Sequence, residues 1–297
     1  MKKLVLGALN IDRTYSVEKL VRPKETIAAV KYESFCGGKG FNQAVALARA
    51  GSEVFIAGVI GYDGGMLFDT LHSDGINTDY IKNSVSPNGH AVIQVDRDGQ
   101  NCIIIVAGSN AEITEDYIDK VLDDFAQGDL IVLQNEVPSV NYAIEEAKRR
   151  GLFIIFNPSP IEDSVKSYGL DKVNMLIVNE LEGAVLSGFE SEADILENLK
   201  RKFPNLSILL TKGENGSVFL NENGMLFRTD AILCEAVDTT AAGDTFTGYF
   251  LDEYFKSHDP QKALRIASIA GGISVTRKGA SSSIPFSGDI LKALSDN

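Results

Sequence analysis

The sequence predicts an α/β fold in which a doubly wound, mostly parallel sheet is flanked by helices and carries a small β-sheet lid. Short apolar segments of strand length alternate with amphipathic segments of helical length, a pattern typical of βαβ units. Two regions, at about residues 11–35 and 88–107, have β character without intervening helices, and we expect them to form the lid. No linker or internal repeat interrupts the 297 residues. The sequence therefore indicates one domain over residues 1–297, with a discontinuous lid inserted into it.

The individual elements follow from their apolar patterns in chain order. The first strand, Lys3–Leu9, is continuously apolar and ends near Asn10 and Asp12, so these polar side chains lie where open α/β sheets bind ligands. A turn at Asp96–Gly99 between two β-branched segments predicts a hairpin. Strands are expected at 54–59, 91–95, 102–106, 130–134, 153–156, 175–178, 207–211, 217–220 and 225–228. Helices are expected after the glycines at 37–40, from about 63 to 73, and at 139–150, 180–187, 192–202, 243–256, 260–276 and 287–295.

The composition is that of a soluble globular protein, with 44% hydrophobic and 23% charged residues. A net charge of -13 and a pI of about 4.7 argue against nucleic acid or an anionic membrane as a partner. They do not exclude ATP, because a local anion site can operate within a negative overall field.

Cysteine usage and the N-terminal sequence are typical of a cytoplasmic protein. Cys36, Cys102 and Cys234 lack C-x-x-C spacing, so we expect reduced thiols rather than disulfides or a zinc site. The apolar segment after Lys2 and Lys3 is too short for a signal peptide. No apolar run approaches the ~20 residues of a membrane span.

The most informative motif is VDTTAAGDTFTG at residues 237–248, a turn of small residues that leads into an amphipathic helix. The backbone N–H groups of Ala241, Ala242 and Gly243 can approach an anion closely at this helix N-terminus. Asp244 lies in the same turn, where a carboxylate suits removal of a proton from a hydroxyl beside a transferring phosphoryl group. Taken alone, the motif also fits an ordinary helix with an acid in its first turn.

A second motif, GGKGFNQA at residues 37–44, also has glycines before a helix. Gly37 and Gly38 allow a ligand to approach the backbone, while Lys39 and Asn42 supply a cation and an amide suited to hydroxyl groups. The motif is not a P-loop, because it lacks the earlier glycine of that pattern and glycine follows Lys39. A simple glycine turn before a helix is the alternative for this motif alone.

Together, the two motifs resemble the signatures of the PfkB family of carbohydrate kinases, in its ribokinase-like branch. The motif at 37–44 is similar to the family's sugar-binding signature and the motif at 237–248 to its catalytic signature, and the resemblance covers essentially the whole chain. It implies an enzyme that transfers the γ-phosphate of ATP to O5 of D-ribose. It also implies Mg²⁺, activation by K⁺ and a homodimer formed through the lid.

The resemblance assigns residues to catalysis and to the sugar. Asp244 is the expected base, and the turn Ala241–Gly243, with the amides of Ala242 and Gly243, is the expected anion hole. The implied sugar-binding residues are Asn10, Asp12, Gly38, Lys39, Asn42, Ala91, Ile93 and Glu136. Carboxylates and amides suit the rim of a polyol. Some of these residues also fit structural roles: the first two as turn residues, Ala91 and Ile93 in a hairpin core, and Glu136 at a helix start.

The resemblance also assigns the nucleotide and the metal ions. The implied nucleotide-binding residues are Asn179, Thr211, Gly213 and Gly216, of which the glycines also fit an ordinary turn. Glu182 is implied near the waters of Mg²⁺, which keeps most of its hydration shell in proteins. The implied positions around K⁺, several through backbone carbonyls, are Asp238, Thr240, Ser274, Arg277, Gly279 and Ser283.

Within the resembled family, Gln43 is the most useful position for telling ribokinase-like members from phosphofructokinase-like ones, so the resemblance implies ribose as the sugar. Phe41, Asn88 and Lys24 depart from the usual pattern and bear on sugar choice more than on catalysis. A kinase of 2-deoxyribose, or of another sugar or nucleoside, is the nearest alternative.

Two functions of other classes are less well supported. A non-catalytic sugar or nucleotide sensor would not need the intact Asp244 and its turn. A dinucleotide oxidoreductase would carry a G-x-G-x-x-G motif after the first strand, which the sequence lacks.

Overall fold

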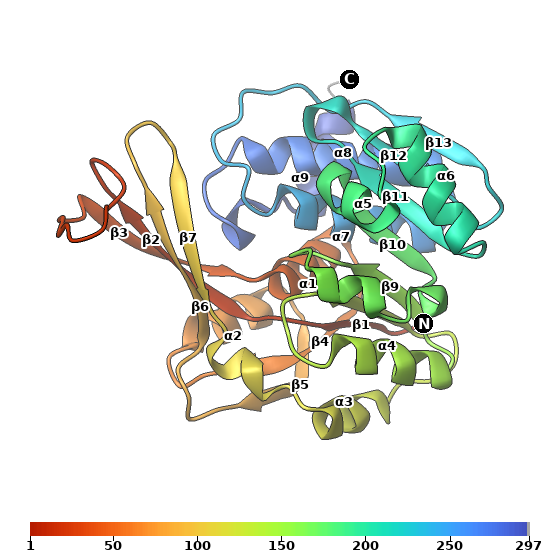
Figure 1. The fold of residues 1–297 in the computed structure, drawn as a ribbon, viewed down its shortest axis with the longest axis horizontal. Coiled ribbons are helices and arrows are strands. Elements are labelled where there is room, and N and C mark those ends of the chain that lie inside the picture. Colours follow the sequence, from red (N-terminus) through yellow and green to blue (C-terminus); the bar gives the residue numbers. More distant parts are fainter. Residues whose placement is uncertain (296–297) are drawn as a thin grey trace.

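Helices cover both faces of a large central sheet, and a smaller sheet projects from one end of it (Figure 1). The protein is described by a computed structural model over residues 1–295. Within these residues the large sheet has nine strands, in the order β13-β12-β11-β10-β9-β8-β1-β4-β5. Neighbours from β11 to β5 pair in parallel, while β12 and β13 add an antiparallel edge. The strands are β1 (Lys3–Leu6), β4 (Val54–Ile60), β5 (Asn77–Asn83), β8 (Leu130–Gln134), β9 (Phe153–Asn157), β10 (Met175–Asn179), β11 (Ser207–Thr211), β12 (Ser217–Leu220) and β13 (Leu226–Thr229).

The strand order reverses at β1, which lies between β4 and β8. The chain builds β4 and β5 on one side of β1 and the strands from β8 onward on the other. At such a switch point the loops leave in opposite directions and open a crevice beyond the carboxyl ends of the strands. The fold therefore places its main crevice beyond Leu6 and Gln134.

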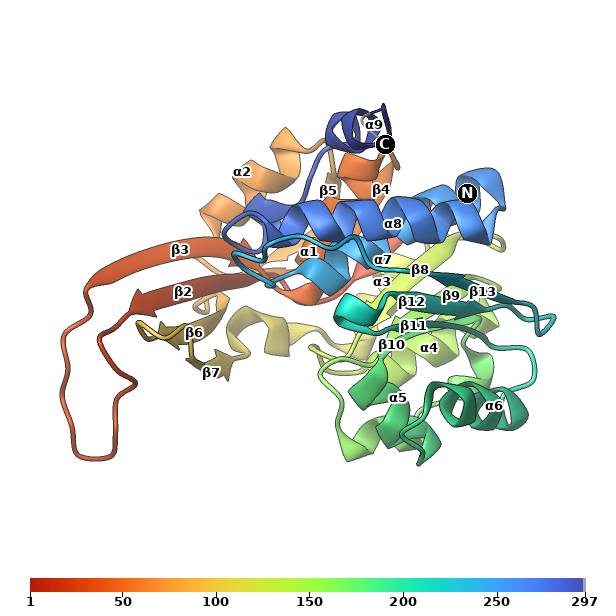
Figure 2. The same ribbon diagram turned by 90° about the horizontal axis from the view of Figure 1, so that it is seen from above.

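The strand side chains form two separate cores because successive residues point to opposite faces. In β1, Leu4 and Leu6 belong to one core and Val5 to the other. Figure 2 shows α1, α7 and α8 on one face and α4, α5 and α6 on the other. The helices are α1 (Lys39–Ala50), α2 (Gly65–Ser73), α3 (Glu115–Leu122), α4 (Val140–Arg149), α5 (Glu180–Ser187), α6 (Glu192–Lys202), α7 (Ala242–Ser257), α8 (Pro260–Val275) and α9 (Ser287–Ser295).

The smaller sheet has the order β3-β2-β6-β7 and combines the two regions predicted to form the lid. Its strands are β2 (Asn10–Ser16), β3 (Lys31–Gly37), β6 (Gly89–Val95) and β7 (Asn101–Val106). β2 pairs in parallel with β6, and each hairpin partner is antiparallel. Only residues 7–9 separate β1 from β2, and only Gly38 separates β3 from α1. The small sheet is therefore joined to the large sheet at the crevice itself.

The predicted doubly wound α/β fold is confirmed, with differences at a few elements. β1 ends at Leu6 rather than Leu9, because the chain turns there into the small sheet at Asn10. β5 and α3 were not predicted. β5 is an edge strand whose sequence, NTDYIKN, lacks the apolar run of the buried strands. α3 begins after the N-cap Thr114 and has acids in its first turn, so its start does carry a local signal.

Among residues 1–295, no helix is both long and apolar enough to cross a membrane.

Candidate active site

Two adjoining cavities occupy the crevice at the strand ends. The larger, of about 650 Å³, lies between the small sheet and the N-termini of α1 and α7. The smaller, of about 210 Å³, lies beyond β9, β10 and β11. Lys39 and Asp244 line both cavities. These two side chains therefore stand at the junction between two ligand-sized spaces.

Asp244 lies in the first turn of α7, where the helix dipole favours a negative charge. Its side chain is buried, at 8% exposure, and both carboxylate oxygens accept hydrogen bonds. Asn42 Nδ2 donates to Oδ2 at 3.2 Å, and Gln43 Nε2 donates to Oδ1 at 2.9 Å. The arrangement presents a carboxyl group at the junction of the cavities, held by one amide donor on each oxygen.

The turn before α7 is strained and has free amides. Ala241 adopts a left-handed conformation with φ of 60°, which costs a non-glycine residue of order 1 kcal/mol and concentrates at functional sites. The Ala242 amide donates to Thr239 O at 3.2 Å, so it closes the turn. Within the described chain, the Gly243 and Asp244 amides have no backbone acceptor. Of the two amides predicted for the anion hole, that of Gly243 is free within residues 1–295 and that of Ala242 is engaged within the turn.

The glycine motif before α1 brings its backbone against the first strand. Gly38 has a φ of 90°, and a Cβ there would lie 2.6 Å from Ala8 O. A Cβ on Gly37 would lie 2.2 Å from Asp12 Oδ2, so only glycine lets this carboxylate approach. Beyond them, the Lys39 amide donates to Glu136 Oε2 at 2.7 Å. The motif thus holds two acids, Asp12 and Glu136, close to its N-terminal end.

Asp12, Glu136, Asp244 and Lys39 share this end of the crevice, and their charges interact. Burial and the charge of Asp244 raise the pKa of Asp12 to about 6. Burial raises the pKa of Glu136 to about 7, against the opposing effect of Lys39. Burial disfavours the Lys39 ammonium, but the charges of Asp244, Glu136 and Glu182 outweigh it and raise the lysine pKa. At neutral pH the site therefore holds a charged lysine beside acids that titrate at different pH values.

The predicted sugar-binding residues come together in the larger cavity. Its lining includes all eight of them, Asn10, Asp12, Gly38, Lys39, Asn42, Ala91, Ile93 and Glu136. Asp238, Thr240 and Gly279, predicted near K⁺, line it as well. The small sheet covers one side through alternate side chains of β6 and β7, among them Ile103 and Ile105. The cavity thus combines a polar floor with an apolar cover.

The predicted nucleotide residues are only partly gathered in the smaller cavity. Asn179, Glu182 and Thr211 line it, whereas Gly213 and Gly216 lie outside its lining among the described residues. A Cβ on Gly216 would lie 2.1 Å from Thr229 O, so the β12–β13 hairpin alone requires glycine there. Asn179 and Glu182 form a capping box at the start of α5, which orients the Glu182 carboxylate.

The segment from Ser274 to Ser283 lies against the turn before α7. Val237 and Asp238 both donate their amides to Val275 O, at 2.7 and 3.1 Å, and the Gly279 amide donates to Asp238 Oδ2 at 3.0 Å. The carboxylate and carbonyl oxygens of the turn before α7 and of the segment from Ser274 to Ser283 suit a hard cation. Arg277 directs its side chain to Asp289, so only its backbone is available to the loop.

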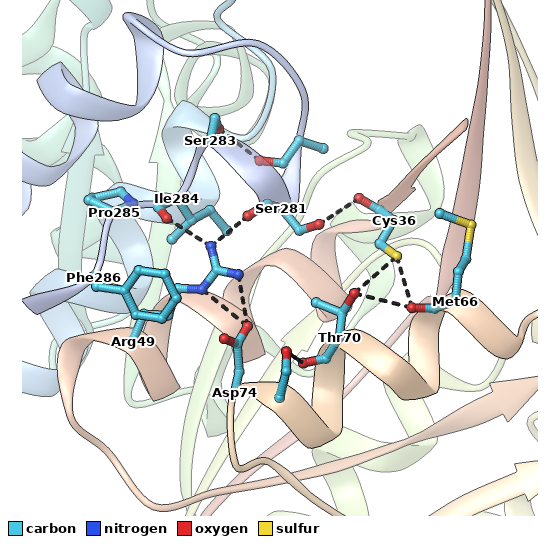
Figure 3. A network of polar contacts seen from close by, with 12 residues as sticks. Cys36, Arg49, Met66, Thr70, Asp74, Ser281, Ser283, Ile284, Pro285 and Phe286 are labelled. Atoms are coloured by element: carbon cyan, nitrogen blue, oxygen red, sulfur yellow. Dashed lines mark hydrogen bonds and ion pairs between the residues drawn. The ribbon is translucent and has the colours of Figure 1, made fainter. Parts of the chain in front are cut away.

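Arg49 of α1 fixes the far end of this segment (Figure 3). Its guanidinium donates to Ser281 O and Ile284 O, each at 2.8 Å, and forms an ion pair with Asp74 at 2.9 Å. The Phe286 ring lies 4.5 Å from the guanidinium carbon. The loop beside the site is therefore anchored to α1 and to the end of α2.

The three departures from the family pattern do not touch the cavities. Phe41 is fully buried in the core between α1 and the sheet, and Asn88 bonds the backbone of Leu9 and Gly61 at the root of the small sheet. Lys24 has a φ of 67°, a conformation that glycine adopts more readily. Gln43 also lies outside both linings, behind Asp244.

Sequence reasoning missed two positioning amides. Gln134 Nε2 donates to Gln43 Oε1 at 2.7 Å, and Asn110 Nδ2 donates to Asn10 Oδ1 at 2.7 Å. Gln134 ends a strand that is otherwise apolar, LIVLQ, and this is a usable signal. Asn110 lies in a short 3₁₀ turn after β7 and carries no comparable signal.

Known proteins with the same fold and related sequences were found over the full chain. A model of the pfkB family of carbohydrate kinases matches residues 2–287. Ribokinase of Haemophilus influenzae is 35% identical, with 98% of this chain and 97% of that protein covered. Deoxyribokinase of Salmonella typhi is 33% identical, with 95% and 94% covered. The structure of Arabidopsis thaliana ribokinase complexed with ribose and ATP superposes with a TM-score of 0.85 at 30% identity, covering 99% of this chain and 98% of that one.

Proposed function

The chain belongs to the pfkB family of carbohydrate kinases, and we propose that it transfers the γ-phosphate of ATP to O5 of D-ribose. The observation that carries the proposal is the position of Asp244, an acid that lines both the larger and the smaller cavity. A phosphoryl-transfer enzyme must hold its acceptor hydroxyl and its donor phosphate on either side of one base. The ribose and ATP bound by the Arabidopsis relative support this assignment.

Asp244 takes the proton of the O5 hydroxyl as that oxygen attacks the γ-phosphorus. The bond from phosphorus to the β,γ-bridging oxygen breaks, and ADP leaves with that electron pair. The Gly243 amide, and the Ala242 amide once it turns from Thr239, stabilise the negative charge on the transferring group. Lys39 adds a positive charge at the same junction.

Ribose binds in the larger cavity. The carboxylate of Asp12 and the amides of Asn10 and Asn42 accept and donate hydrogen bonds around a polyol. Ala91 and Ile93, on β6, cover its apolar face. In this proposal the small sheet is a lid, which excludes water from the reacting groups when it closes.

ATP binds beyond the strand ends at the smaller cavity. Asn179 and Thr211 line the cavity and bind the nucleotide, and the turn with Gly213 and Gly216 borders its outer part. Glu182 is the acid suited to the waters of a phosphate-bound Mg²⁺, which supplies charge neutralisation when bound. Among residues 1–295 no cluster of three or more acidic, histidine or cysteine side chains is arranged to hold a metal, which suits an ion held mainly by water and phosphate.

A monovalent cation, K⁺, binds between the two loops beside the anion hole. Asp238, Thr240, Ser274, Arg277, Gly279 and Ser283 supply carboxylate and carbonyl oxygens to it. When bound, K⁺ strengthens the positive field at the anion hole. The protein's own part is to hold Asp238 against Gly279.

The protein acts as a cytoplasmic homodimer joined through the small sheets. On β7, Ile103 and Ile104 are 53% and 61% exposed, and such an apolar edge strand invites pairing. Sedimentation velocity measures the oligomeric state. A monomer at micromolar concentration would contradict the proposed dimer.

An ADP-release assay tests the reaction. Mg-ATP and K⁺ are supplied with ribose, 2-deoxyribose, fructose, fructose 6-phosphate, adenosine or pseudouridine in turn. Turnover with ribose well above the others is the expected result, and a better acceptor elsewhere in the panel would overturn the sugar assignment. Asp244→Asn keeps the shape and removes the base, so turnover should fall by roughly a hundredfold or more. A loss smaller than tenfold would contradict the role of Asp244.

A kinase of 2-deoxyribose is the second candidate, favoured by the relative that is 33% identical. The two sugars differ by one hydroxyl, and the panel separates them directly. A higher kcat/KM with 2-deoxyribose would favour this candidate.

A further inference from the structure

Three buried side chains form a hydrogen-bonded chain that leads away from the cavities. Gln43 Nε2 donates to Asp244 Oδ1 at 2.9 Å, and Gln134 Nε2 donates to Gln43 Oε1 at 2.7 Å. Gln43 is 1% exposed and Gln134 is 0% exposed. Neither glutamine lines either cavity. Their contact with the site is therefore through Asp244 alone.

The direction of this chain follows from the chemistry of its end. An ionised carboxylate only accepts hydrogen bonds, so Gln43 must turn its NH₂ group toward Asp244. Its oxygen then faces away, and only a donor can satisfy it there. Gln134 is that donor.

The buried amide of Gln134 destabilises the fold, and packing alone does not explain why an amide occupies this position. The rest of β8 is apolar and fully buried, and the Gln134 side-chain oxygen has no hydrogen-bond partner among the described residues. An unsatisfied buried polar atom is destabilising, and an apolar side chain of similar volume would avoid it. Gly7 makes room for the amide, because a Cβ on Gly7 would lie 2.1 Å from Gln134 Oε1. The fold accommodates a polar group where an apolar one would be more stable.

We propose that Gln43 and Gln134 are positioning residues that hold the Asp244 carboxylate correctly oriented for proton transfer. The inference rests on the proposed role of Asp244 as the base. Gln134 fixes the orientation of Gln43, and Gln43 fixes the Oδ1 side of the carboxylate. Asn42 holds the Oδ2 side at 3.2 Å and also lines the sugar cavity. Gln43, which the sequence singled out for its resemblance to ribokinase-like members, thus acts on the base and not by touching the sugar.

The test compares kcat with KM in variants that keep the volume of the side chain. In Gln134→Met and Gln43→Met, kcat should fall roughly ten- to hundredfold, the scale expected when a reacting group is misplaced. KM for ribose and for ATP should change by less than about threefold, because neither glutamine lines a cavity. The double variant should be no slower than Gln43→Met alone, since residues that act as a unit are not additive.

Gln134→Glu distinguishes a role of Gln134 in the hydrogen-bonded chain from a role in packing alone. Its shape is nearly that of glutamine, so a packing role predicts an unchanged kcat. The buried carboxyl group donates to Gln43 Oε1 while it is protonated and cannot donate once it ionises. A role in the hydrogen-bonded chain therefore predicts that, relative to the parent, kcat falls toward that of Gln134→Met as the pH rises. Thermal melting verifies the fold of each variant, and Gln134→Met carries the test if Gln134→Glu does not fold.

The control is Asn198→Leu in α6. Asn198 is also a buried amide whose oxygen lacks a partner among residues 1–295, but it lies on the face of the sheet away from α1 and α7. It should lose no turnover.

Asp244→Asn is measured beside these variants to separate the two proposals. An active Asp244→Asn would overturn the proposed base. An inactive Asp244→Asn together with a wild-type kcat in both glutamine variants would overturn only the positioning role of the glutamines.

Discussion

Gly248 of α7 lies directly against Ala46 of α1, and a Cβ on Gly248 would come within 2.4 Å of the Ala46 Cβ. The same Cβ would lie 2.7 Å from the Leu47 amide nitrogen. About one helical turn earlier on each helix, Asp244 meets Asn42 and Gln43. The missing side chain of Gly248 therefore sets the helix separation at which these amides reach the carboxylate.

Gly248→Ala should weaken both stability and catalysis. The added methyl group forces α1 and α7 apart, which should lower the unfolding free energy by about 1–3 kcal/mol and reduce kcat. Urea denaturation and the ADP-release assay measure the two effects. Gly65→Ala, at the start of α2 with no atom within 4 Å of the new Cβ, is the matched control. Equal stability and turnover in the two variants would contradict this account.

Arg49→Met should destabilise the protein strongly. It leaves the Asp74 carboxylate, whose side chain is 2% exposed, without its ion pair, and frees two carbonyls of the loop beside the site. Removing one partner of a buried pair costs about 3–5 kcal/mol. Arg149→Met removes an arginine that is 65% exposed and paired with Glu146, so its cost should be at most about 1 kcal/mol. Chemical denaturation of both variants provides the comparison, and similar losses would count against a structural role for the Arg49 network.

Glu136 should make the unliganded protein less stable as pH rises. The carboxyl keeps its proton up to about pH 7 in the folded state, whereas its ordinary pKa is 4.5. Between these values the folded state binds more protons than the unfolded state, so the unfolding free energy falls with increasing pH. Glu136→Gln removes the titration and retains an oxygen for the Lys39 amide. Above pH 7 the variant should be more stable than the parent by about 3 kcal/mol, with the difference vanishing toward pH 4.5.

Urea denaturation across this pH range measures that difference. Glu214→Gln, on the exposed turn after β11, should follow the parent at every pH. If the difference in unfolding free energy between Glu136→Gln and the parent stays constant with pH, the titration of Glu136 does not cause it.

Removal of K⁺ should lower turnover. Tetramethylammonium is larger than K⁺ and should not occupy the proposed site between the loops of Asp238 and Gly279, so kcat/KM should fall when it replaces K⁺. K⁺ should also raise the melting temperature of the protein without substrates, because a ligand that binds only the folded state stabilises it. Asp238→Asn should weaken both effects. Identical rates and melting temperatures in the two cations would reject the K⁺ site.

The sequence by itself determined the fold class, the family and most elements of this protein. Apolar runs of strand length and the glycine turns before α1 and α7 are local signals, because they depend on residues that are adjacent in the chain. Strands such as Leu130–Gln134 and Ser207–Thr211 were predicted with their observed bounds. The edge strand β5 was missed because it lacks an apolar run.

Only the tertiary structure decided what surrounds Asp244. Gln43 and Gln134 lie 91 residues apart in the chain and meet because a parallel sheet gathers its carboxyl ends at one edge. The separation of α1 and α7 depends on the contact of Gly248 with Ala46, which no local pattern encodes. The raised pKa values of Asp12 and Glu136 likewise arise from burial and from charges distant in sequence. Chemistry at the site is a property of long-range packing, whereas the elements that carry it are a property of local sequence.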